Sequence, residues 1–153
     1  MARYIAKVKS CKLTPSGGAE ITIKGVKSAA ITVDHGMLKE FDADDEVPFF
    51  YKGQVSKTVE LELRDYDVAV QLASVGCVSS ITLELANPVP ACSTSAAAAQ
   101  ITLAATNLAV TSGVSFNADA SGTPTTYSIT LELGHNDSGA AGTWTITAAG
   151  GGA

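Results

Sequence analysis

The residues best suited to chemistry in this chain are its two histidines. His35 and His135 lie far apart in turn-like segments rich in Gly, Asp and Asn, and neither belongs to a zinc-protease, serine-hydrolase or Cys-His motif. A histidine in such a turn is far more often a turn residue than a general base, so the sequence predicts no catalytic residue and no enzyme activity. No glycine-rich loop joins a strand to a helix as a nucleotide site requires, and we expect no cofactor.

A run of carboxylates is the second feature with chemical potential, because hard cations bind where several oxygens lie close together in sequence. The run consists of Asp42, Asp44, Asp45 and Glu46. It lacks the spacing of a calcium loop and the glutamate at that loop's last position, so the sequence favours a solvated acidic loop and no metal site. The cysteines have neither disulfide-framework nor zinc-type spacing, and we expect free thiols at Cys11, Cys77 and Cys92.

Aromatic side chains lie beside these acids, in the longest stretch without a strand pattern, His35–Gly53. A loop of this length inside a compact domain is usually functional or mobile, and clustered aromatics are rarely left in solvent. Two interpretations remain open: the aromatics close one end of the protein's own core, or they anchor a contact with an adjacent subunit. The candidate interface residues are Phe41, Phe49, Phe50 and Tyr51.

Charge is divided unevenly along the chain, whose formal net charge is −5. All ten Lys and Arg residues fall within residues 1–64, whereas residues 65–153 hold acids and no cation. This balance argues against nucleic acid as a directly bound ligand. So few charges in the second half predict that copies of the protein cover one another, because a monomer normally displays charges of both signs. No segment is long and apolar enough to span a bilayer, and we expect no membrane partner.

Alternation of apolar and polar residues with period two is the dominant structural pattern. Together with abundant Val, Ile, Leu and Thr, it predicts an all-β protein, an antiparallel β-sandwich or barrel. We expect one domain over residues 1–148, with a linker or crossing segment at 87–99, and a flexible C-terminal tail at 149–153. Strands are expected around residues 4–8, 20–24, 31–34, 59–64, 81–84, 101–103, 114–116, 129–133 and 144–146.

One stretch changes to helical spacing. Val68, Leu72 and Val75 recur on one helical face, Asp65 is placed to cap the N-terminus, and Gly76 is placed to end the last turn. The sequence therefore predicts a single short helix of about three turns.

Several segments follow one another in the order found in a known family. They are Gly25–Asp34, the acidic and aromatic loop, Gly53–Asp65 leading into the short helix, and Thr125–Gly134 as a closing strand. In this order, over residues 20–148, the chain resembles the tail tube (major tail) proteins of long-tailed bacteriophages. The resemblance implies two packed antiparallel sheets with a flanking helix, hexameric rings whose sheets join into an inner barrel, and a long loop that contacts the next ring.

The resemblance also implies partners and a location. The partners are further copies of the chain, other virion structural proteins, and genomic DNA that passes through the lumen without specific binding. The location is the virion, in the phage tail, after assembly in the host cytoplasm. Glu60 and Glu62 alternate with predicted core residues and are candidate lumen-facing acids, since carboxylates repel a phosphate backbone. Because no cation follows Arg64, any salt bridge between rings depends on cations from the first half of a neighbour.

Two other functions remain open. One is a capsid decoration or head auxiliary protein. The other is a carbohydrate-binding β-sandwich module, a class that commonly presents a flat aromatic face. The single tryptophan, Trp144, lies in a Thr-flanked alternating segment that suits a core position better than a sugar-binding face.

Overall fold

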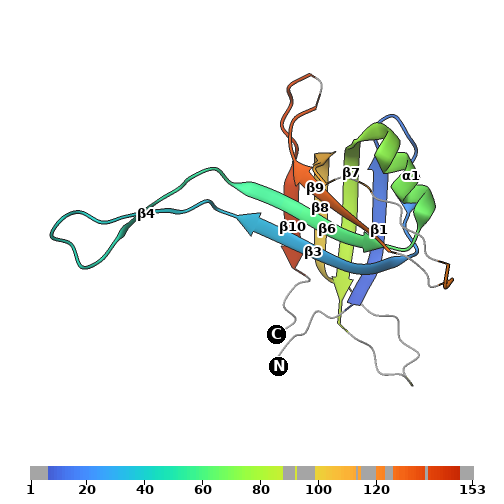
Figure 1. Ribbon diagram of the computed structural model, residues 1–153, viewed down its shortest axis with the longest axis horizontal. Helices are drawn as coiled ribbons and strands as arrows, with labels where there is room; N and C mark the ends of the chain where they lie inside the picture. The colour runs from blue at the N-terminus through green and yellow to red at the C-terminus, as the bar shows by residue number, and fades with distance from the viewer. Residues whose placement is uncertain are drawn as a thin grey trace.

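The fold is an antiparallel β-structure with one short helix among the described residues. The computed structural model describes residues 7–87, 92, 99–112, 114, 120–122, 126–136 and 138–148. An eight-stranded sheet has the order β2-β1-β7-β8-β9-β6-β3, with β10 paired to β8, and a second sheet consists of β4 and β5 alone (Figure 1). The predicted all-β class with one short helix is confirmed.

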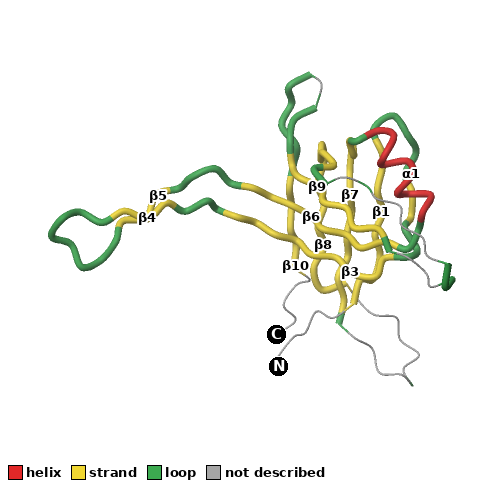
Figure 2. The backbone as a smooth tube through the Cα atoms, in the orientation of Figure 1, coloured by secondary structure: helices red, strands yellow, loops and turns green. Residues whose placement is uncertain are grey.

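Figure 2 shows the strands in yellow and the one helix of the described residues in red. They are β1 (Lys7–Pro15), β2 (Ile21–Thr22), β3 (Val26–Asp34), β4 (Leu38–Glu40), β5 (Phe49–Tyr51), β6 (Ser56–Leu63), α1 (Tyr66–Val75), β7 (Cys77–Ala86), β8 (Ala99–Val110), β9 (Tyr127–Leu133) and β10 (Trp144–Ala148).

The large sheet curls so that its two halves share one hydrophobic core. In Figure 1, β3 and β6 cross in front of β1, β7 and β8. Period-two alternation explains this arrangement, because it places Val59, Leu61 and Leu63 of β6 on the buried face. They join buried side chains of β1, β7, β8, β9 and α1 in a single cluster. The closed-barrel alternative is wrong, because the sheet ends at β2 and β3 without a pairing between them.

Strand β8 changes partner midway along its length. Residues 101–105 pair with β10, whereas Leu108–Val110 pair with β9. Asn107 lies between these two stretches with φ 57°, a left-handed conformation that asparagine tolerates better than most residues. Its carbonyl oxygen accepts the N–H of Gly134 at 2.9 Å. Strands β9 and β10 both run antiparallel to β8, so they follow one another along the same edge of it.

The helix α1 begins and ends where the sequence predicts. The Asp67 N–H donates to Asp65 Oδ1 at 3.2 Å, and Gly76 adopts φ 72° while its N–H donates to the Leu72 carbonyl at 2.9 Å. Of the three apolar residues at helical spacing, Val68 and Leu72 are buried in the core, whereas Val75 is 42% exposed. Within the described part of the chain, no helix has the length and hydropathy needed to cross a membrane.

Several predictions fall partly or wholly outside the described residues. The linker or crossing segment at 87–99 is described only at Asn87, Cys92 and Ala99, and the tail at 149–153 is not described. Of the predicted strand at 114–116, only Val114 is described, and it is not in a strand. The strand predicted around residues 20–24 is shorter than expected, since β2 contains only Ile21–Thr22.

Candidate functional site

The most distinctive feature of the molecule is an arm, residues 35–55, that extends from the body as a continuation of β3 and β6 (Figures 1 and 2). Within it, β4 pairs antiparallel with β5, in a register that places Lys39 opposite Phe50. The expectation of a wholly irregular loop is therefore wrong, because a short ladder stiffens its middle. The arm carries all four predicted interface aromatics.

At the base of the arm, the backbone segments that enter and leave it approach each other closely, at Gly36, Gly53 and Gln54. We call this close approach the pinch. Gly36 adopts φ 57°, and its N–H donates to Asp34 Oδ1 at 2.8 Å. A Cβ at Gly36 would collide with the Gln54 carbonyl oxygen, and a Cβ at Gly53 would collide with the Gly36 carbonyl oxygen. Only glycine fits such a close backbone approach. The arm therefore leaves the body in a defined direction.

The side chains of the arm do not pack into the protein's own core. Of the exposed large hydrophobic side chains, eight belong to the arm: Met37, Leu38, Phe41, Val47, Phe49, Phe50, Tyr51 and Val55. Phe50, for example, is 62% exposed. The ring of Phe41 lies 4.9 Å from Lys39 Nζ, a cation–π contact. Of the two interpretations of the aromatics, packing in the chain's own core is excluded, which leaves them available to a partner.

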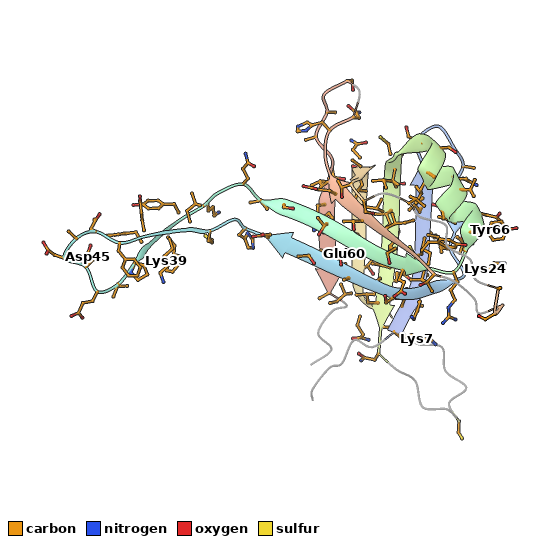
Figure 3. All side chains as sticks on the ribbon, viewed as in Figure 1. Lys7, Lys24, Lys39, Asp45, Glu60 and Tyr66 are labelled. Atoms are coloured by element: carbon orange, nitrogen blue, oxygen red, sulfur yellow. The ribbon has the colours of Figure 1, made fainter. Side chains whose placement is uncertain are left out.

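The acidic run forms the tip of the arm. Asp42, Asp44, Asp45 and Glu46 are all exposed, and the Asp45 N–H donates to the Asp42 carbonyl at 3.1 Å in a turn (Figure 3). Across the described residues, no group of three or more His, Cys, Asp or Glu side chains is arranged to hold a metal ion. The tip therefore presents solvated carboxylates next to exposed aromatics.

Glu60 and Glu62 lie on the outer face of the sheet formed by β3, β6 and β9. The cross-strand register places Glu60 between Ala30 and Thr130, and Glu62 between Ser28 and Ser128. Because their neighbours are small, a hollow of about 400 Å³ lies over the two acids. We call this surface the acidic face.

Glu62 is held in place by three donors. The hydroxyls of Thr126 and Ser28 donate to its carboxylate at 2.8 Å and 3.2 Å, and Lys27 Nζ lies 3.3 Å from Oε1. The Thr126 hydroxyl and the Lys27 ammonium hold the pKa of Glu62 below its ordinary value, so the side chain stays ionised. Glu60 is exposed, and no hydrogen bond or ion pair of its side chain is found among the described residues.

The histidines do not come together. His35 lies exposed at the base of the arm, whereas His135 lies in the connection between β9 and β10, where it forms an isolated β-bridge with Ala141. His135 and the exposed thiol of Cys77 line the same hollow, of about 310 Å³, beside Val75 and Asn136. In contrast, Cys11 is fully buried, and burial raises the pKa of its thiol to about 12.

The outer face of α1 is a feature that the sequence reasoning missed. Tyr66 and Val70 are 62% and 49% exposed there, although both are large and apolar. Their spacing of four residues, on the face opposite Val68 and Leu72, was a readable signal of a second apolar stripe.

Comparison with known proteins places the fold. No protein-family model and no curated protein matches the chain. Among the solved structures that match, three cover at least 94% of the chain. The cap of the anti-feeding prophage, described as a tube terminating cap, is 18% identical with a TM-score of 0.51, over 97% of this chain and 95% of that one. A double mutant of the Hcp1 protein from E. coli EAEC 042 is 12% identical with a TM-score of 0.54, over 94% and 99%.

The third is a chain of the sheath-tube complex of PVC, an extracellular contractile injection system, in the extended state. It is 18% identical with a TM-score of 0.51, over 95% of this chain and 93% of that one. Identities this low establish a shared fold and nothing finer. At that level, the resemblance to tail tube proteins expected from the order of sequence elements is confirmed.

Proposed function

We propose that this protein is a structural subunit that self-assembles into stacked, hexameric rings to form a phage tail tube. The observation that carries the proposal is the arm, which presents eight large apolar side chains to solvent on a chain with the fold of tube and cap proteins. Contiguous exposed apolar surface of this kind marks an interaction site. Phe41, Phe49, Phe50 and Tyr51 are its proposed interface residues.

The edges of the sheet support lateral assembly. In the described residues, β3 pairs only with β6 and β10 pairs only with β8, so each has one row of backbone groups without a strand partner. Such edges are aggregation-prone in a monomer and are satisfied when strands continue across subunits. Ring closure through these edges would join the sheets into an inner barrel.

We assign the acidic face to the lumen, with genomic DNA as the molecule that passes along it. Carboxylates at Glu60 and Glu62 repel a phosphate backbone and keep it from adhering. Reversing both charges with Glu60→Lys and Glu62→Lys should then impair DNA passage more than folding. Normal infectivity of particles assembled from this variant would contradict the lumen assignment.

The experiment that tests the function is negative-stain microscopy of the purified protein at increasing concentration, combined with analytical ultracentrifugation. We expect rings and then tubes. Monodisperse single molecules at millimolar concentration would overturn the proposal. An oligomer that attached only to capsids would instead identify a decoration protein. A monomer that was retained on a glycan column would identify a carbohydrate-binding module.

A further inference from the structure

The connection between β9 and β10 is a projecting loop with a defined backbone. In Figure 1 it extends beyond the ends of both strands, at the top of the view. The Asn136 N–H donates to the Ala140 carbonyl at 2.9 Å, and the Gly139 N–H donates to the Asn136 carbonyl at 2.9 Å. Asn136, Ser138 and Ala140 are all exposed. The loop therefore presents these residues to solvent in a fixed arrangement.

The carboxamide of Asn136 has one defined orientation. Its Oδ1 accepts the Ser138 N–H at 3.1 Å, the Ser138 hydroxyl at 2.8 Å and the Ala140 N–H at 2.8 Å. A backbone N–H needs an acceptor, and the amide nitrogen is only a donor, so the oxygen must lie on this side and Nδ2 on the other. No hydrogen bond of Nδ2 is found among the described residues. The nitrogen is therefore available from solvent.

Asn136 begins the tripeptide Asn136-Asp137-Ser138, which has the Asn-x-Ser pattern of an acceptor for N-linked sugars. The other asparagines have neither Ser nor Thr two residues later: Asn87, Asn107 and Asn117. An amide nitrogen is a poor nucleophile because its lone pair is delocalised onto the oxygen. Donors to the oxygen stabilise the negative charge that it gains when Nδ2 loses a proton. The three donors to Oδ1, one of them the hydroxyl of the tripeptide, therefore favour the reactive form of the nitrogen.

The surroundings of the loop have room and use for a sugar. A Cβ added at Gly139 would meet no atom within 4 Å, and the neighbouring side chains of Ala140 and Ala141 are small and exposed. Residues 65–153 contain no cation. A glycan on a surface loop is bulky and solubilising, so it would hydrate a half of the chain that carries little charge.

We propose that Asn136 is a site of N-linked glycosylation, modified with a hexose from a nucleoside diphosphate hexose by a glycosyltransferase. Nδ2 forms a bond to the anomeric carbon of the sugar, and the bond between that carbon and the diphosphate oxygen breaks. The nucleoside diphosphate leaves, and the transferase takes the Nδ2 proton. The inference is independent of the proposed tube function, because it uses only the loop and its tripeptide.

Glycosylation of the purified protein tests the inference. The folded full chain is incubated with UDP-glucose and a soluble N-glucosyltransferase that acts on Asn-x-Ser/Thr, then denatured, cleaved after glutamate and weighed by mass spectrometry. Since no glutamate follows Glu132, Asn136 falls in the peptide 133–153 as its only asparagine. We expect one hexose on this peptide and none on the peptide 85–132, which contains the other three asparagines. A synthetic peptide of residues 133–153 shows that the transferase is active. Modification of that peptide without modification of the folded chain would overturn the proposal.

Three variants separate glycosylation from the role of these residues in the turn. Asn136→Asp keeps an oxygen acceptor for the same three donors and removes Nδ2, so the turn is retained and no hexose should be found. Ser138→Thr keeps the hydroxyl and should be modified. Ser138→Ala removes one donor to a developing charge and should be modified about ten-fold more slowly. A hexose on Asn136→Asp, or equal rates for Ser138→Ala and the unsubstituted chain, would contradict the assignment.

Discussion

At the scale of one residue, the buried thiol of Cys11 leads to two predictions, one for its reactivity toward thiol reagents and one for the pH dependence of the protein's stability. Burial raises its pKa from the ordinary 9.0 to about 12, whereas Cys77 and Cys92 are exposed. A thiol reagent at pH 8 should therefore modify two thiols in the native protein and all three in denaturant. Because the unfolded chain loses the Cys11 proton from about pH 9 and the folded chain keeps it until about pH 12, stability should fall as pH rises between these values.

The matched control is Cys11→Ala, which should remove this part of the pH dependence at the cost of a small cavity. Urea unfolding at pH 8, 9 and 10 measures it. Rapid modification of a third thiol in the native protein would show that Cys11 is accessible.

The second prediction at the scale of one residue concerns Glu62, because its hydrogen-bond partners lower the pKa of its carboxylate. The hydroxyl of Thr126 and the ammonium of Lys27 lower its pKa, so its contribution to stability is present above the ordinary value of about 4.5 and is lost as pH falls through the folded-state pKa. Thr126→Val and Lys27→Met should each move the pKa of Glu62 back toward the ordinary value. Carboxyl-carbon NMR titration measures this shift. An unchanged pKa in both variants would mean that these contacts do not form in solution.

At the scale of elements, the pinch at the base of the arm predicts a selective effect of adding one methyl group. Gly53→Ala places a Cβ against the Gly36 carbonyl oxygen, so the two backbone segments at the base of the arm must move apart or change their direction. We expect a redirected arm and weaker stacking, with the melting temperature of the body nearly unchanged. Gly18→Ala is the control, since its Cβ would meet only ordinary contacts at 3.6 Å or more. Equal stacking by the two variants would contradict a role for the pinch.

The body strands were predictable and the arm was not, for one physical reason. A strand with one buried face shows a period of two, so Val59, Leu61 and Leu63 could be assigned to the core and Glu60 to the outside from spacing alone. β4 and β5 are exposed on both faces and bury nothing, so their sequences carry no alternation. Their pairing depends on the pinch and on the ladder of β3 and β6 that brings the chains together.

The partner change of β8 was unpredictable for a different reason. The change depends on which residues of β8 pair with β9 and which pair with β10. Both of these strands come later in the chain, and the residues near Asn107 do not specify the pairing. The helix, in contrast, is fixed by its own residues: a capping acid, two core positions and a terminal glycine are all local. The same distinction holds for the candidate site. The sequence shows which aromatic and acidic residues the arm contains. It does not show that they are exposed, or that the arm and α1 lie at opposite ends of the β3–β6 pair.

At the scale of the whole molecule, assembly and folding should be separable. No residue of the arm belongs to the buried core, so the body does not depend on the arm for its hydrophobic stabilisation. We predict that replacing residues 37–52 with a two-glycine turn leaves the cooperative unfolding of the body intact and abolishes stacks. Rings should still form, because the edges of β3 and β10 remain.

The companion variant is Leu61→Ala, which removes a side chain that is only 2% exposed in the core. It should cost about 2–5 kcal/mol of folding free energy and leave the arm's surface unchanged, so that any molecules still folded continue to stack. Thermal unfolding and negative-stain microscopy of both variants give the two readouts independently. Tubes formed by the armless protein would show that stacking uses another surface, and loss of its cooperative unfolding would show that the arm is part of the folding unit.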